Sequence, residues 1–167
     1  MGGLSSENLV FDNAVLSNFA RIERLGLLLS VSNGLFVTNE VLEEVCQGQK
    51  KHPKLAVIGE FAEAGKLRVA SATDLGCLAL AAKLQAEKIL GLGEISAMVL
   101  AKEMGGVFVT DDKQATNRAI RLGIKVPNRQ EYRSTIVFIQ LLKSKKTITS
   151  SEYANIKRDL AGEGYVF

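Results

Sequence analysis

Short, largely apolar runs alternate with segments of helical periodicity along this chain. Each run is three residues long and is typical of a buried strand. The runs interpreted as strands are residues 9–11, 35–37, 67–69, 107–109 and 124–126. Elsewhere, apolar residues that recur every three or four positions predict helices. The expected helices are one that follows Thr38 and those at residues 14–22, 54–63, 74–84, 94–104, 114–122, 131–142 and 150–160.

Strands that alternate with helices are typical of a parallel sheet covered by helices, so the sequence predicts an α/β fold. The length of 167 residues corresponds to one domain. We place it at residues 8–167, with a helical extension at its C-terminal end, after a flexible leader at residues 1–7. The apolar side chains of the helix at 131–142 are a candidate dimer face; they are Ile136, Phe138, Ile139 and Leu142.

The scarcity of histidine and cysteine limits the chemistry that the chain can perform. Cys46 and Cys77 form no CxxC pair, and His52 is the only histidine. A structural zinc site needs about four such ligands, so we expect none. Two thiols that stay unpaired are the expected state in a reducing cytosol. Because His52 lies in a polar, basic loop, enzymatic chemistry would rest on carboxylates.

Charge is distributed unevenly along the chain. From Lys113 onward there are 11 Lys and Arg residues against 4 Asp and Glu residues. This asymmetry favours an anionic partner for the C-terminal third, although a solvated helix surface would give the same count. No apolar stretch reaches the roughly 18 residues of a membrane span. The first residues also lack a signal segment, so we expect a cytoplasmic protein that does not contact membranes.

Acidic residues follow two of the predicted strands. Asp12 ends the first strand, and Asp111 and Asp112 follow the strand at 107–109. In an open parallel sheet, ligands bind beyond the carboxyl ends of the strands. Glu44, on the helix after the second strand, and Glu94, at the start of a later helix, can join them there. The sequence therefore predicts an acidic site at one edge of the sheet.

Carboxylates gathered at one edge repel one another unless a cation is present or their pKa values are raised. Oxygen ligands suit Mg²⁺ or Mn²⁺. A divalent metal held by carboxylates suits the hydrolysis of phosphodiester bonds. The basic C-terminal third would then hold the rest of a nucleic-acid strand through its phosphates.

Each of these carboxylates also has an ordinary structural explanation. Asp12 can cap the helix that follows it, and Asp111 or Asp112 can cap the helix at 114–122. Glu94 can simply favour the positive end of its helix. Glu44 belongs to a cluster of glutamates that can all be solvated.

Four segments together resemble the motifs of PIN-domain proteins, a family of metal-dependent ribonucleases. The matching segments run from residue 9 to about residue 126 and carry Asp12, Glu44, Glu94 and Asp112. They are Leu9–Leu16, Val37–Val45, Gly93–Met98 and Val107–Asp112. The chain is most similar to a bacterial and archaeal subgroup with Glu as the third acid.

The resemblance implies a three-layer α/β/α sandwich with a central parallel sheet. It also implies a pocket that holds one or two Mg²⁺ or Mn²⁺ ions, and often a homodimer. Many small prokaryotic members are VapC-like toxins, ribonucleases that a small antitoxin protein inhibits. The chain departs from the usual pattern in having Glu94 where Asp is commoner and Asn13 where Thr or Ser is common.

The resemblance also assigns roles to the acidic residues. Asp12, Glu94 and Asp112 would bind the metal ion, and Asp111 would be a further ligand or a supporting residue. Glu44 would orient or deprotonate the attacking water, or bind a second ion.

Other residues are expected around the acidic site. Asn13, Asn18 and Thr110 are candidates for hydrogen bonds that support the carboxylates. Candidates for contact with the RNA backbone are Arg118, Arg121 and Lys125.

Other functions remain open at this stage. A PIN-like domain without catalytic activity could bind RNA or protein. A nucleotide-binding enzyme is disfavoured because Gly91-Leu92-Gly93 is followed by Ser96 in place of the third glycine of a dinucleotide fingerprint. A response-regulator receiver is disfavoured because Lys125 falls within a predicted strand rather than at its end.

Overall fold

Four short parallel strands form the central sheet in the computed structural model, which describes residues 3–167. They are β1 (Asn8–Phe11), β2 (Gly34–Val37), β3 (Arg68–Val69) and β4 (Val107–Val109), and their order in the sheet is β3-β2-β1-β4. Leu9 of β1 lies between Leu35 of β2 and Val107 of β4. The predicted parallel sheet is therefore confirmed for four of the five expected strands.

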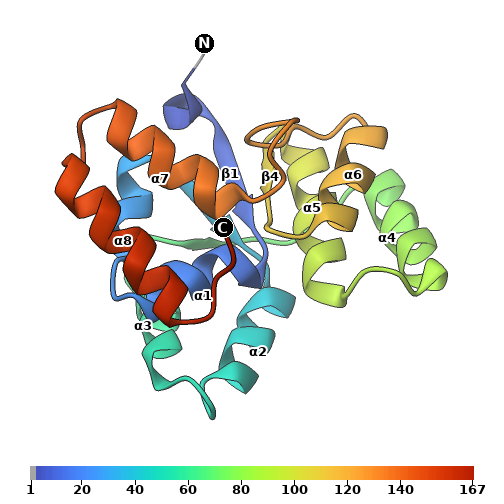
Figure 1. Cartoon of the computed structure of the whole chain (residues 1–167). Coiled ribbons are helices and arrows are strands. Elements are labelled where there is room, and N and C mark those ends of the chain that lie inside the picture. Colours follow the sequence, from blue (N-terminus) through green and yellow to red (C-terminus); the bar gives the residue numbers. More distant parts are fainter. Residues whose placement is uncertain (1–2) are drawn as a thin grey trace.

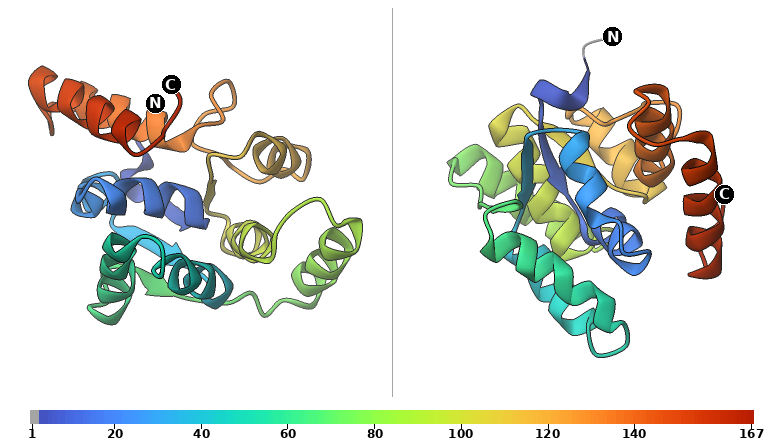
Figure 2. Two further views of the ribbon diagram at one scale, coloured as in Figure 1. Left: turned by 60° about the horizontal axis from the view of Figure 1, so that its bottom comes forward. Right: turned by 90° about the vertical axis from the view of Figure 1, so that its left-hand side faces the viewer.

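Helices cover both faces of the sheet, which gives the three-layer α/β/α sandwich. In Figure 1, α1, α3, α7 and α8 lie on one side of β1 and β4, and α4, α5 and α6 lie on the other. The left view of Figure 2 shows α7 and α8 beyond α1, and α4 outside α5. The helices are α1 (Asn13–Arg21), α2 (Asn39–Gly48), α3 (Ala56–Glu63), α4 (Leu75–Glu87), α5 (Leu92–Met104), α6 (Lys113–Arg121), α7 (Ser134–Ser144) and α8 (Ser150–Gly162).

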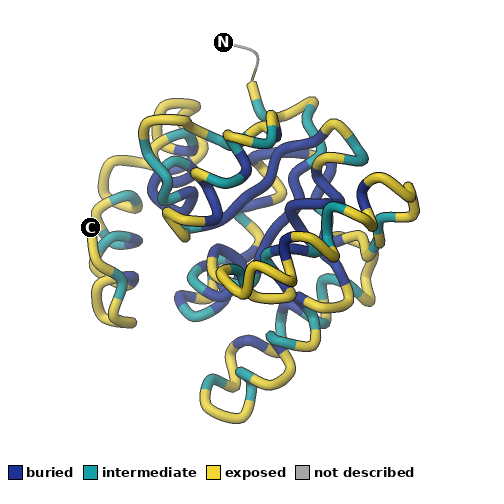
Figure 3. Tube along the Cα trace, turned by 90° about the vertical axis from the view of Figure 1, so that its right-hand side faces the viewer, coloured by how far each residue is buried: buried dark blue, intermediate teal, exposed yellow. Residues whose placement is uncertain are grey.

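The core lies between the sheet and its flanking helices, and Figure 3 shows the buried segments gathered at the centre of the molecule. The ring of Phe11 in β1 meets the ring of Phe138 in α7 edge to face, with centroids 6.1 Å apart. Phe138, Ile139 and Leu142 are fully buried within this single chain, and Ile136 is 8% exposed. The prediction that these α7 side chains form a dimer face is therefore wrong, because the core of the domain already covers them.

Residues 124–126 do not form the expected fifth strand. Lys125 makes only one parallel bridge, to Val107, and the Phe108 backbone N–H donates to its carbonyl. Pro127 follows immediately and has no N–H with which to extend the ladder. The segment therefore stays beside the start of β4.

The predicted flexible leader falls partly outside the described residues, since residues 1–2 are not among them. A short 3₁₀ turn, η1 (Leu4–Ser6), precedes β1. Leu4 packs against the core. Two further 3₁₀ turns are η2 (Leu25–Ser30) and η3 (Pro53–Leu55).

The sheet has a point where its strand order reverses. The chain moves outward from β1 through β2 to β3, then crosses back to place β4 on the other side of β1. Ligands of open α/β sheets bind at such a point, beyond the carboxyl ends of the strands. The residues that follow β1 and β4 are therefore the first place to look for a site.

Among residues 3–167, no helix has the length and apolar character needed to cross a membrane. The longest helices there, α4, α5 and α8, have 13 residues each, against the roughly 20 that a span needs.

Candidate active site

Asp12 lies directly after β1 and is 3% exposed. One of its oxygens, Oδ1, accepts a hydrogen bond from the Ala14 backbone N–H at 3.0 Å, so Asp12 caps α1. Its other oxygen accepts the hydroxyl of Thr110. Burial, together with the nearby carboxylates of Asp111 and Glu94, raises the pKa of Asp12 to about 8.

Thr110 joins the two strands that meet at the reversal point. It is buried at the end of β4, donates its hydroxyl to Asp12, and accepts the Asp112 backbone N–H at 3.0 Å. Asp112 itself is exposed, and its Oδ1 caps α6 by accepting the Ala115 N–H at 2.7 Å. The supporting role expected of Thr110 is therefore present, and one hydroxyl fixes both aspartates relative to each other.

Glu44 reaches from α2 to the start of α5. Its Oε1 accepts the Gly93 backbone N–H at 3.0 Å. A Cβ at position 93 would lie only 2.5–2.7 Å from the carboxylate atoms of Glu44. Gly93 therefore leaves the space that this carboxylate occupies, and the sequence pattern gave no sign of this pairing.

Glu94 lies one residue further along α5. Its Oε2 accepts the Gly91 N–H at 2.9 Å, which closes the first turn of the helix. Burial and the carboxylates of Asp112 and Glu44 raise the pKa of Glu94. Glu94 therefore lies near Asp12, Glu44 and Asp112, although the four acids come from four separate segments.

A hydrogen-bonded pair of hydroxyls aligns α2 with α5 beneath these acids. Thr38 caps α2 by accepting the Val41 N–H, and its hydroxyl lies 2.7 Å from that of Ser96. Ser96 in turn donates to the Gly93 carbonyl at 3.0 Å. This contact spans 58 residues of sequence, so only the fold reveals it.

The acidic edge lacks compensating positive charge. Of the ion pairs found within residues 3–167, none involves Asp12, Glu44, Glu94, Asp111 or Asp112. Carboxylates that face one another without a basic partner are costly unless they are protonated or bind a cation.

The family of the chain follows from a match over most of its length. A family model described as a PIN domain, DUF3368, matches residues 8–160, which include all four strands and the five acidic residues. The chain belongs to the PIN-domain family. PIN domains are generally nucleases, and PIN nucleases generally use divalent metal ions. No curated protein matches this PIN domain closely enough to count as a relative.

The donor set of this PIN domain suits a hard divalent cation, because it consists of carboxylate oxygens. Three of the carboxylates, those of Glu44, Glu94 and Asp112, each accept a hydrogen bond from a backbone N–H through one oxygen. The other oxygen of each has no hydrogen bond within residues 3–167. No group of three or more His, Cys, Asp or Glu side chains in that range is already arranged around a common ion position. The backbone contacts explain this, since each carboxylate would have to turn toward Asp12 to share an ion.

Asp111 of the PIN domain turns toward α7 instead. Its Oδ1 accepts the Thr135 N–H at 2.8 Å, and its Oδ2 accepts both the Thr135 hydroxyl at 2.7 Å and the Asn18 amide at 2.9 Å. These bonds favour a structural role over metal binding for Asp111. They also give Asn18 its predicted supporting role, because Asn18 holds Asp111 from α1.

Asn13 does not support a carboxylate as expected. Its Oδ1 accepts the Ser17 hydroxyl at 2.6 Å, one turn along α1. The side chain is thus used within its own helix.

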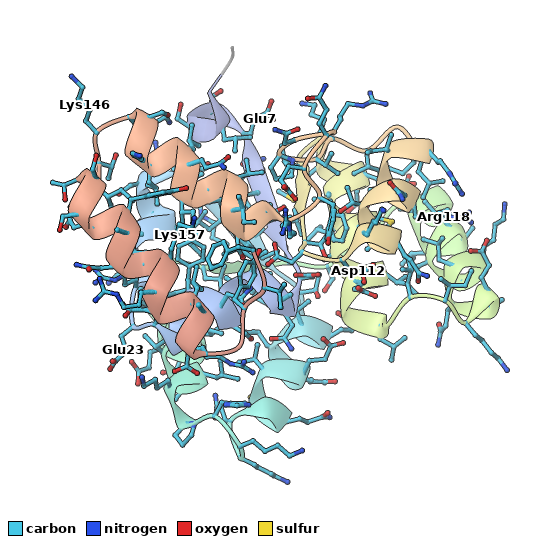
Figure 4. All side chains as sticks on the ribbon, viewed as in Figure 1. Glu7, Glu23, Asp112, Arg118, Lys146 and Lys157 are labelled. Carbon is cyan, nitrogen blue, oxygen red and sulfur yellow. The ribbon has the colours of Figure 1, made fainter. Side chains whose placement is uncertain are left out.

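The three basic residues predicted to contact RNA lie in different places. Arg118 and Arg121 are on α6, and Figure 4 shows Arg118 toward α4 and away from Asp112 at the start of the helix. Arg118 forms an ion pair with Glu87. Lys125 pairs with Glu7 beside the start of β4, at the amino edge of the sheet and thus opposite the acids. The structure therefore does not bring Lys125 together with the acidic residues.

The two cysteines are unpaired, as predicted. Both thiols were also expected to be buried or half-buried, which is right for Cys77 but wrong for Cys46, because Cys46 is exposed.

Proposed function

We propose that this PIN domain is a metal-dependent endoribonuclease that hydrolyses RNA phosphodiester bonds at the acidic edge of the sheet. The observation that supports this most strongly is that Glu94 lies near three other carboxylates, those of Asp12, Glu44 and Asp112, each from a separate segment. None of the four has a basic partner among the described residues. A polyanionic substrate would not enter such a site unless a cation offset the repulsion.

Asp12, Glu94 and Asp112 are the residues that would hold Mg²⁺ or Mn²⁺. When bound, the ion supplies positive charge that stabilises the negative charge developing on the phosphate. Asp12 would anchor it from the buried side, and Asp112 and Glu94 would close around it from α6 and α5. Thr110 keeps Asp12 and Asp112 aligned through its two hydrogen bonds.

Glu44 is suited to orient the attacking water and to accept its proton. Gly93 holds one oxygen of the carboxylate, which leaves the other free for water. The water oxygen then forms a bond to phosphorus while the bond to the leaving ribose oxygen breaks, and that oxygen takes up a proton. Asp111 is hydrogen-bonded to Thr135 of α7, so in this proposal it supports the site and does not bind the metal ion.

The decisive experiment measures cleavage of a panel of single-stranded and tRNA-like RNAs with Mn²⁺, Mg²⁺ or EDTA. Wild type and Asp12→Asn are compared, because Asn can still cap α1 but cannot supply a carboxylate. Glu7→Gln, at the opposite edge of the sheet, is the matched control. Metal-dependent cleavage by wild type and the control, absent from Asp12→Asn, is the expected result. Equal activity in Asp12→Asn would refute the site.

A catalytically silent module that binds RNA or protein is the alternative. The structural roles found for the acids as helix caps favour it to some degree, since caps need no metal. This alternative predicts that Mn²⁺ leaves the melting temperature unchanged, because a ligand of the native state would raise it.

The proposal extends to the biological setting of a VapC-like toxin: a cytoplasmic homodimer that a small antitoxin inhibits. A protein partner is supported by the leucines that α4 presents to solvent, Leu75 at 82% and Leu78 at 46% exposure. Induced expression in bacteria should arrest growth for wild type but not for Asp12→Asn. Equal growth of both would count against the toxin role alone.

A further inference from the structure

A cavity of about 230 Å³ lies between α6 and the segment that joins α4 to α5. We call it the α6 pocket. Four of its lining residues come from α6 and two from the connecting segment: Gln114, Asn117, Arg118, Arg121, Ile89 and Leu90. The cavity is smaller than the 300–1,000 Å³ that is common for sites of drug-sized ligands. It therefore suits a single small ring or group.

Both walls of the α6 pocket continue directly from the acidic residues. Gln114 is two residues after Asp112, which caps α6. On the other wall, Leu90 precedes Gly91, whose N–H is bound by Glu94. Since α6 rises about 1.5 Å per residue, the pocket begins within a few ångströms of Asp112 along the helix. A group bound at the Gln114 end of the pocket would therefore lie close to a phosphate bound near Asp112 and Glu94.

The lining combines an apolar wall with polar groups that read hydrogen-bonding edges. Ile89 is 63% exposed, which leaves an apolar surface open to solvent at the pocket. Gln114 and Asn117 are exposed amides that each offer a donor and an acceptor. Sequence-specific proteins read unstacked RNA bases by stacking them on aromatic side chains or guanidinium planes and by hydrogen bonds to the base edges. The α6 pocket offers a guanidinium and two amides for these contacts, with Ile89 as an apolar wall.

One guanidinium of the pocket is already fixed in place. Arg118 is held by Glu87 at the end of α4, and its Nε is buried without a hydrogen-bond partner. Arg121 lies one helical turn further on and is exposed. The ion pair holds the planar guanidinium of Arg118 in one orientation, on which a base can stack. Arg121 is placed to contact a phosphate at the mouth of the pocket.

We propose that the α6 pocket binds one unstacked nucleobase of single-stranded RNA, that of the nucleotide next to the phosphodiester bond that is cut. The proposal rests on the proposed ribonuclease function and adds the determinant of its base preference. Asn117 and Gln114 select the base by hydrogen bonds to its edge, and Ile89 supports any base as an apolar wall. The roles of Arg118 and Arg121 thereby change from general backbone contacts to parts of one subsite.

The test is cleavage of a randomised single-stranded RNA library with Mn²⁺, followed by sequencing of the new ends. Wild type should favour one or two bases at a single fixed position beside the cut. Asn117→Ala and Gln114→Ala should each reduce that preference by about tenfold, the scale of one lost bidentate contact. Ile89→Ser should raise KM for all bases alike. Gln140→Ala, which removes an exposed amide on α7, is the matched control and should keep the wild-type profile.

The possible outcomes distinguish a failure of the α6 pocket from a failure of the proposed ribonuclease function. Cleavage with no base preference in wild type, or with the same preference in both amide variants, would overturn the α6 pocket and leave the ribonuclease standing. Absence of any cleavage by wild type would overturn both. Circular-dichroism melting of each variant excludes unfolding as the cause, and Ala at these exposed helical positions is favourable for the helix.

Discussion

The two edges of the sheet differ in whether their carboxylates are paired with a basic side chain. At the amino edge, Glu7 is paired with Lys125, whose Nζ lies 3.2 Å from both carboxylate oxygens. At the carboxyl edge, Glu94 lies near both Asp12 and Asp112, and none of the three has such a partner among the described residues. Both edges also use a glycine to let groups come close. Gly34 makes room for the amide of Asn8, whereas Gly93 makes room for the carboxylate of Glu44.

This contrast teaches that the acidity of the carboxyl edge is not a general property of the protein. The chain has 21 basic residues and pairs several of them with acids elsewhere. At the strand-order reversal, burial and like charges together raise the pKa values of Asp12 and Glu94. Carboxyl groups with pKa values raised in this way are candidates for a functional site.

The largest effect should appear in the pH dependence of stability without metal. The pKa of Asp12 is about 8 in the folded chain, against 3.8 as its ordinary value, so the folded state binds the extra proton. The contribution of Asp12 to stability in EDTA should therefore be fully present below about pH 4 and be lost as the pH rises through about 8. Urea unfolding at each pH measures this. The fall should be much smaller in Asp12→Asn, and an equal fall in both would refute the assignment.

Metal binding at the carboxyl edge should restore the stability that is lost at high pH. At a free Mn²⁺ concentration one hundred times Kd, stabilisation should reach about 2.7 kcal/mol. Thermal melts with and without Mn²⁺ at pH 7.5 would show the rise for wild type and for Glu7→Gln, but not for Asp12→Asn. A rise that survives in Asp12→Asn would place the ion elsewhere.

Gly93→Ala should separate activity from stability. The added methyl group would occupy the place of the Glu44 carboxylate, so cleavage should fall by about a hundredfold, the scale of a lost general base. Stability should change little, because Glu44 can swing away and Ala favours the helix. In a Glu44→Ala background, Gly93→Ala should cause no further loss of cleavage. A further tenfold loss there would show that Gly93 acts independently of Glu44.

The smallest effect should come from the amino edge. Glu7→Gln removes an ion pair whose side chains are 34% and 56% exposed, and such pairs contribute about 0–1 kcal/mol. Chemical denaturation should show a loss within that range, with cleavage unchanged. A loss of cleavage would mean that the two edges are coupled.

The alternation of strands and helices was enough to predict the sheet, its parallel direction and the edge at which Asp12, Glu94 and Asp112 lie. It was not enough to decide between their roles, because the same residues are both helix caps and members of the acidic cluster. That dual role follows from position, since the residue after a parallel strand usually begins a helix. Sequence alone therefore leaves capping and catalysis indistinguishable.

The contacts that sequence could not supply are those between distant segments. Asp111 binds Asn18 and Thr135, which lie 93 and 24 residues away. Lys125 was a candidate for RNA contact because it belongs to the basic C-terminal third of the chain. A single bridge to Val107, ended by Pro127, leaves it at the opposite edge.

Because Thr110 links Asp12 to Asp112, the geometry of the site depends on the register of β4 against β1. β4 has three residues, and its register against β1 alone decides that Thr110 meets Asp12. A slip of one residue would turn that side chain to the other face of the sheet. Folding errors of this kind could keep most of the core and still lose the pairing of the two aspartates. The catalytic rate would therefore depend on the fraction of molecules with the correct register. A measurement of compactness or helix content would not detect that fraction.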